Sequence, residues 1–141
     1  MAMFLIAGCT SQTTDPAESA IVVSGLSFPF CAGYCTTELV IDNGELRYTE
    51  SSRDSTRYPP RTRTQALSAE EWSRLRQLVD LAALETVVGT HGCPGCADGG
   101  IEWLEIRSGE RSPRATFEHG QELAPVRELQ REVRALRERF R

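Results

Sequence analysis

Alternating apolar and polar residues in the segment TELVIDNGELRYTE predict a β-hairpin over residues 37–50. At its centre, Asn43-Gly44 is a preferred type I′ turn, because both residue types tolerate a positive φ. A two-residue turn then pairs apolar residues across the two strands, and these pairs are Ile41 with Leu46 and Leu39 with Tyr48. Turn and pattern agree on one register, so this hairpin is the strongest structural prediction from the sequence.

Three further segments have the character of strands. The β-rich run IVVSGLSFPF predicts a first strand over Ile21–Phe30 that ends at its proline. A short strand is expected over Thr62–Leu67. The segment Ile101–His119 predicts a second hairpin with its turn near Ser108-Gly109, and Pro113 places the return strand at an edge, at least locally.

Helical periodicity appears twice. Ser68 and Glu71 form a capping box for a helix from about Ala69 to Leu81. Its apolar face is formed by Trp72, Leu75, Leu78, Val79 and Ala82. A second helix is predicted from about Pro125, which suits the first helical position. Its apolar residues recur at helical spacing and are Val126, Leu129, Val133, Leu136 and Phe140, while arginine and glutamate fill the other faces.

These elements predict an α+β fold in which an antiparallel sheet of about four to six strands is covered on one face by two helices. A cysteine pair, a hairpin and a helix follow one another twice, which suggests a ββα pseudo-repeat. We expect residues 21–141 to form a single domain.

Composition excludes some functions. The 141 residues include 16 basic and 20 acidic residues, and all the basic residues are arginine. The resulting net charge of -4 argues against nucleic-acid binding, which needs a basic excess. The sequence shows no G-x-S-x-G nucleophile elbow and no phosphate-binding glycine loop. Glu102 and Glu105 fall on opposite faces of their strand, so we interpret them as strand surface, not as a paired acid and base.

The N-terminus resembles a bacterial lipoprotein signal. The apolar run MFLIAG ends in Ile6-Ala7-Gly8-Cys9, an aliphatic residue and two small residues before a cysteine, as in a lipobox. This resemblance implies that residues 1–8 are a signal peptide remnant and that Cys9 is the lipidated first residue of the mature protein. Residues 9–20 are small and polar and are interpreted as a flexible tether.

The other four cysteines are Cys31, Cys35, Cys93 and Cys96. An oxidising envelope favours two disulfides among them, and four cysteines allow three pairings. Local pairs, Cys31 with Cys35 and Cys93 with Cys96, close very short loops, whereas crossed pairs close long loops and constrain the unfolded chain more. We favour the local pairs, and geometry decides between the pairings.

Two alternatives use the same cysteines. Cys31, Cys35, Cys93 and Cys96 could supply four thiolates to a zinc ion, with His91 able to replace one of them. The segment Cys93-Pro-Gly-Cys96 resembles a thioredoxin-type dithiol with its inner residues reversed, although the βαβ context of such a dithiol is missing. Beyond the zinc alternative, the sequence implies no cofactor.

The segment FCAGYCTTELVIDNGELRY resembles the signature of a widespread group of bacterial secreted proteins and lipoproteins of unknown function. Their motif is Cys-x-Gly-x-Cys-Pro-x-Tyr, then an alternating strand, an Asp/Asn-Gly turn and a strand with an aromatic residue. The matching positions are Cys31, Gly33, Cys35, Asn43, Gly44 and Tyr48; Thr36 and Glu38 stand where the group has Pro and Tyr. Asp98 and the helix Val126–Phe140 are counterparts of later features of the group. The resemblance implies an α+β envelope domain and supplies no activity.

Together these features predict a lipid-anchored protein on the periplasmic side of the outer membrane. We expect it to be a non-catalytic binding or structural protein with an envelope protein as partner. The alternatives are a thiol-disulfide redox factor that uses Cys93 and Cys96 and a zinc-stabilised interaction module.

Overall fold

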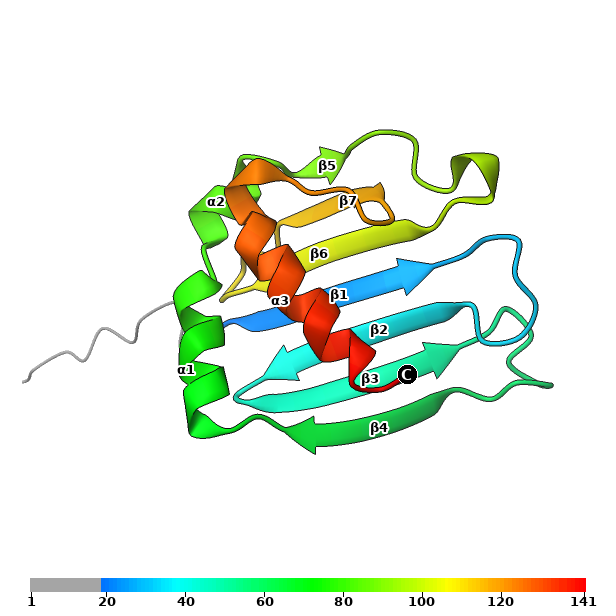
Figure 1. Cartoon of the computed structure of the whole chain (residues 1–141), viewed down its shortest axis with the longest axis horizontal. Helices are drawn as coiled ribbons and strands as arrows, with labels where there is room; N and C mark the ends of the chain where they lie inside the picture. Colours follow the sequence, from blue (N-terminus) through cyan, green and yellow to red (C-terminus); the bar gives the residue numbers. More distant parts are fainter. Residues whose placement is uncertain (1–18) are drawn as a thin grey trace, which may run out of the picture.

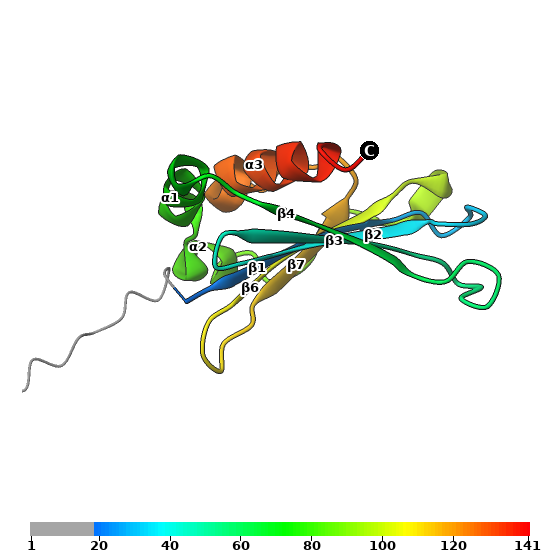
Figure 2. The same ribbon diagram turned by 90° about the horizontal axis from the view of Figure 1, so that it is seen from below.

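A twisted, seven-stranded sheet with helix α3 lying across one face forms the body of the computed structural model (Figures 1 and 2), which describes residues 19–141. The strand order is β4-β3-β2-β1-β6-β7-β5, antiparallel except for the parallel pair of β5 and β7. The strands are β1 (Ile21–Ser27), β2 (Thr36–Asp42), β3 (Glu45–Ser51), β4 (Arg61–Ala66), β5 (Gly89–Thr90), β6 (Ile101–Arg107) and β7 (Arg114–Glu118). The helices are α1 (Ala69–Leu78), α2 (Leu81–Glu85) and α3 (Arg127–Glu138), with single 3-10 turns η1 (Cys96–Asp98) and η2 (Ala124–Val126).

The α+β class and the antiparallel sheet confirm the prediction, with one strand more than expected. That strand, β5, has two residues and pairs with β7 only at Ala115 and Thr116. Two residues are too few for a period-2 pattern, so the sequence carried no signal for it.

The predicted first hairpin is confirmed in its register. Leu39 lies opposite Tyr48 and Ile41 opposite Leu46, and all four side chains are buried in the core. Both turn residues have a positive φ, 45° at Asn43 and 78° at Gly44.

The predicted first helix ends earlier than expected. Val79 has extended backbone angles and closes α1, and Asp80 then starts a separate helix by accepting a hydrogen bond from the Ala83 amide. A side chain that caps a new helix competes with continuation of the old one. Residues 19–141 therefore have three helices where two were predicted, and Leu84, not the exposed Ala82, reaches the core.

Helix α3 covers the sheet as predicted. The five apolar residues predicted for this helix are all buried, although Val126 and Phe140 lie just outside the bounds of α3, and the ring of Phe140 stacks on that of Tyr48 at 4.8 Å between centroids. Pro125 belongs to the preceding turn η2, and the α-helix itself begins at Arg127.

The prediction for the two glutamates of β6 was half right. Glu102 and Glu105 lie on opposite faces, but they are only 2 % and 9 % exposed, so they are not strand surface. Glu102 points into the helix-covered face, where Arg134 and Arg137 of α3 donate hydrogen bonds to it. These arginines are distant in the sequence but compensate the buried charge of Glu102. The alternation of residues along a strand carries no information about such partners.

Candidate functional site

Both cysteine loops lie at one end of the sheet. The central strand β1 has β2 on one side and β6 on the other, both antiparallel to it, and Ser27 at its end lies opposite both Thr36 and Ile101. The loops that precede β2 and β6 must therefore emerge together, at the right of Figure 1. They also pack on each other, because a Cβ placed on Gly95 would lie 3.6 Å from the ring of Pro29.

Each loop carries its own disulfide. Cys31 is bonded to Cys35 and Cys93 to Cys96, with Cα–Cα distances of 5.6 and 5.5 Å. The structure thus has the two predicted disulfides in the favoured local pairing. Cys9, the predicted lipidation site, lies outside the described residues.

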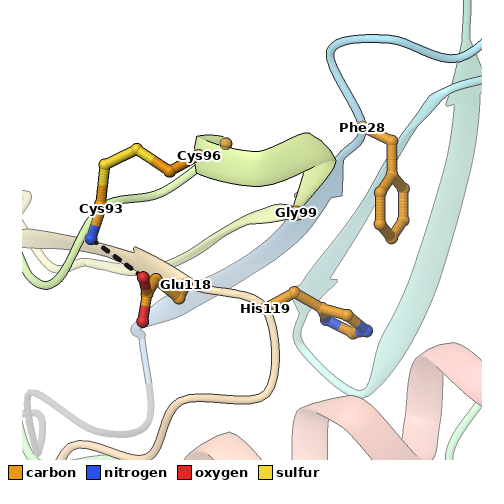
Figure 3. Close-up of a pocket in the computed structure, with 8 residues that line it drawn as sticks. Phe28, Cys93, Cys96, Gly99, Glu118 and His119 are labelled. Carbon is orange, nitrogen blue, oxygen red and sulfur yellow. Dashed lines mark hydrogen bonds between the residues drawn. A yellow bond between two sulfur atoms is a disulfide. The ribbon is translucent and has the colours of Figure 1, made fainter.

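A cavity of about 340 Å³ lies beside the second disulfide (Figure 3). Its lining includes Cys93 and Cys96 together with Phe28, Glu118 and His119. A carboxylate oxygen of Glu118 accepts a hydrogen bond from the Cys93 amide at 3.1 Å, which ties the loop to β7. The rings of Phe28 and His119 meet edge to face at 5.7 Å.

Two more cavities follow, each sharing lining residues with the one before it. A cavity of about 210 Å³ shares Phe28 with the first and is also lined by Tyr34, Cys35 and Tyr48. A third, of about 590 Å³, shares Glu50 and Arg141 with the second and reaches β4 at Arg61, Thr62 and Arg63. We call this row of three cavities the stapled groove, because both disulfides border it.

The chemical character of the stapled groove changes along its length. Aromatic rings line its middle. At the β4 end, the Arg61 guanidinium lies 3.7 Å from the centroid of the Tyr34 ring, and the Tyr34 hydroxyl donates to the Pro59 carbonyl at 2.8 Å. Stacking of this kind holds the guanidinium plane and leaves its edge available for acceptors. The opposite end carries Glu118 and His119.

The surroundings of the second disulfide favour a structural role. Both cysteines are exposed. The Cys93 amide donates a hydrogen bond to the Glu118 carboxylate, and Cys93 does not start a helix. The short turn η1 begins at Cys96. A reactive thiolate needs a nearby cation or a helix N-terminus, and a neighbouring carboxylate opposes it. The redox hypothesis gains nothing from this geometry.

The zinc hypothesis requires free thiolates at these positions, with His91 able to replace one, whereas the structure pairs all four sulfurs in two disulfides. Among residues 19–141, no three His, Cys, Asp or Glu side chains are grouped so as to hold a metal ion. Metal analysis of the purified protein remains the test of that hypothesis.

No protein-family model matches this chain, and neither does any curated protein. Within residues 19–141, no helix has the length and apolarity needed to cross a membrane.

The sequence indicated the cysteines of this site and missed the groove. The residues that it left unassigned are Phe28, Tyr34, Glu50, Arg61, Arg63, Glu118, His119 and Arg141. They come from six separate segments, and no local pattern joins them. The one available signal was that each cysteine pair directly precedes a hairpin, which would have placed both loops at equivalent strand ends.

We expect the intact mass of the protein, alkylated under denaturing and non-reducing conditions, to show Cys31, Cys35, Cys93 and Cys96 unmodified. Peptide mapping should then recover the two local pairs, because their Cα–Cα distances suit a disulfide. Crossed pairs or four alkylated thiols would contradict the structure.

Proposed function

We propose that this chain is a lipid-anchored protein of the bacterial cell envelope that binds an extended ligand, without catalysis, in the stapled groove. The observation that carries the proposal is the meeting of two separately disulfide-bonded loops at one row of cavities that share lining residues. Disulfides restrict the loops before a ligand arrives, so less conformational freedom is lost on binding.

The position of the N-terminal segment supports the anchoring part of the proposal. Strand β1 begins at Ile21, at the end of the sheet opposite the disulfide loops (Figure 1). A lipid on Cys9 would attach the protein by that end. The stapled groove would then face away from the membrane, toward ligands in the periplasm.

The ionisable groups of the groove support binding over catalysis. A carboxylate oxygen of Glu50 lies 3.8 Å from the Arg61 Nε and 3.6 Å from the Arg63 Nη2. The Glu118 carboxylate accepts a hydrogen bond from a backbone amide. The Glu50 carboxylate thus partly neutralises the charge of two arginines, and the Glu118 carboxylate holds the second disulfide loop. The two groups lie at different places along the groove. A general acid or base needs a free group within hydrogen-bond reach of the reacting atom, and these carboxylates are already engaged with their neighbours.

A photo-crosslinking amino acid placed in cells at Phe30, directly before the first cysteine of the Cys31–Cys35 disulfide, tests the binding part of the proposal. Val88 is the matched control, since these are the two exposed large apolar side chains among the described residues, at 79 % and 56 %. Val88 directly precedes β5, at the end of that strand away from the groove. We expect adducts from position 30 that position 88 does not give; equal labelling would contradict a binding end at the disulfide loops.

The anchoring part has its own test. Cells fed with labelled palmitate should incorporate it into the wild-type protein and not into Cys9→Ala, and the label should fractionate with the outer membrane. Absence of label from the wild-type protein would contradict lipidation whatever the crosslinking shows.

A further inference from the structure

The β4 side of the sheet ends in a long open edge. All six residues of β4 are exposed, whereas the other edge strand of the described chain, β5, has two residues. The Leu67 amide donates to the Gly44 carbonyl, which sets the alternation of hydrogen-bonded pairs between β3 and β4. By that alternation, the backbone groups of Arg61, Arg63 and Gln65 point toward β3. Those of Thr62, Thr64 and Ala66 point outward, where no strand of residues 19–141 lies beside them.

Strand β4 and the loop before it are basic in an acidic protein. Residues 53–66 contain four arginines and one aspartate, although the whole chain has a net charge of -4. Arg61 and Arg63 lie opposite Glu50 and Tyr48 and so share the groove side of β4. Both side chains are about half exposed, at 59 % and 52 %, and their ion pairs with Glu50 are long. One carboxylate between two guanidiniums leaves room for another anion.

We propose that an extended acidic segment of a partner protein adds to the free edge of β4 as a further strand and places a carboxylate against Arg61 and Arg63. This rests on the proposed function and names the kind of ligand that the β4 end of the stapled groove takes. The outward amides and carbonyls of Thr62 and Thr64 supply the main-chain bonds of strand addition, and the arginines supply the preference for acidic side chains.

The charges disfavour a second copy of this chain as the occupant. If the β4 strands of two copies paired antiparallel, the arginines of one copy would lie close to the arginines of the other across the new strand pair. Like charges facing each other across a strand pair are destabilising. The same arginines also discourage aggregation through this edge, so the edge selects against neutral and basic strands and admits acidic ones.

The test uses the full chain in non-ionic detergent and a fluorescein-labelled, seven-residue blocked peptide that alternates glutamate and valine. The control peptide has lysine in place of glutamate. We expect saturable binding of the acidic peptide alone, which weakens as salt is raised. Amide exchange at Thr62 and Thr64 should slow when the peptide binds, because their outward N–H groups become bonded.

Two pairs of variants separate the backbone from the charge. Thr64→Pro removes an outward N–H without touching the bonds to β3, and Thr64→Val keeps that N–H. Arg61→Gln removes the stacked guanidinium, and Arg47→Gln removes an exposed arginine from the adjacent strand on the opposite face. We expect Thr64→Pro and Arg61→Gln each to weaken binding about tenfold and the two controls to leave it unchanged.

Several results would overturn the proposal. These are no saturation up to about 1 mM peptide, equal binding of the lysine peptide, or an unchanged affinity in Thr64→Pro. A dimer in sedimentation that Thr64→Pro abolishes would assign the edge to a second copy and would overturn it as well. If any of these results is obtained while position 30 still gives crosslinks that position 88 does not, the acidic-strand proposal falls and the proposed function stands.

Discussion

Replacement of Gly25 by alanine should lower the free energy of unfolding by about 3 kcal/mol, the upper part of the range for overpacking. Gly25 lies in the central strand β1, on the face away from the helices, and the indole of Trp103 in β6 lies directly over it. A Cβ at position 25 would be 1.9 Å from one ring carbon and 2.0 Å from another. The indole, which is 7 % exposed and has the Arg114 guanidinium 4.9 Å from its ring, would have to leave its site.

Thermal or denaturant unfolding measures this effect, and a double-mutant cycle identifies its cause. In a Trp103→Ala background the same Gly25→Ala change should cost under about 1 kcal/mol, because the ring that it clashes with is gone. Additive effects of the two substitutions would show that Gly25 is required for another reason.

Glu102→Gln is expected to destabilise the protein by about 3 kcal/mol, as when one partner of a buried ion pair is removed. The Glu102 carboxylate accepts hydrogen bonds from Arg134 at 2.9 and 3.1 Å, from Arg137 at 2.5 Å and from the Gly120 amide at 3.0 Å. Arg137 is itself buried, and its Nη1 has no hydrogen-bond partner among the described residues. A neutral amide at position 102 would leave that guanidinium charged and uncompensated.

Glu105→Gln is the matched control in the same strand. Glu105 points to the opposite face, and its partners Arg107 and Arg114 are each 47 % exposed, so water can solvate them when the carboxylate is lost. We expect a loss of about 1 kcal/mol or less. Similar losses at positions 102 and 105 would contradict the special role of the buried cluster.

The same cluster predicts how stability depends on pH. Burial raises the pKa of Glu102, but hydrogen bonds from Arg134 and the Gly120 amide and the charge of Arg137 outweigh it and hold the pKa below its ordinary 4.5. A lowered folded-state pKa gives stability that is present above pH 4.5 and is lost as the pH falls through the folded value. The stability difference between wild type and Glu102→Gln should therefore shrink in acid, and a pH-independent difference would contradict this assignment.

The fold was largely predictable because its strongest signals are local. The Asn43-Gly44 turn and the alternation around it determine one hairpin register, and the spacing of Val126, Leu129 and Val133 determines the buried face of α3. The break between α1 and α2 was missed because Asp80 caps a new helix only where the chain turns to bring Leu84 into the core.

The candidate site was predictable only in its cysteines. A short C-x3-C or C-x2-C spacing brings two sulfurs within reach of each other in a loop, so the local pairs could be favoured from spacing. The stapled groove could not be predicted, since Phe28, Arg61 and His119 become neighbours of one row of cavities only when β1, β4 and β7 take their places in the sheet.

The sequence by itself determined the longer strands, helix α3 and the face that each of them buries, and the tendency of the four cysteines to pair, because these depend on residues a few positions apart. The tertiary structure decided which strands are neighbours. It thereby placed both disulfide loops at one end, left β4 as an open basic edge and brought Glu102 to Arg134 and Arg137. Such long-range neighbours follow from the burial of all apolar faces at once, and no short window of sequence contains that constraint.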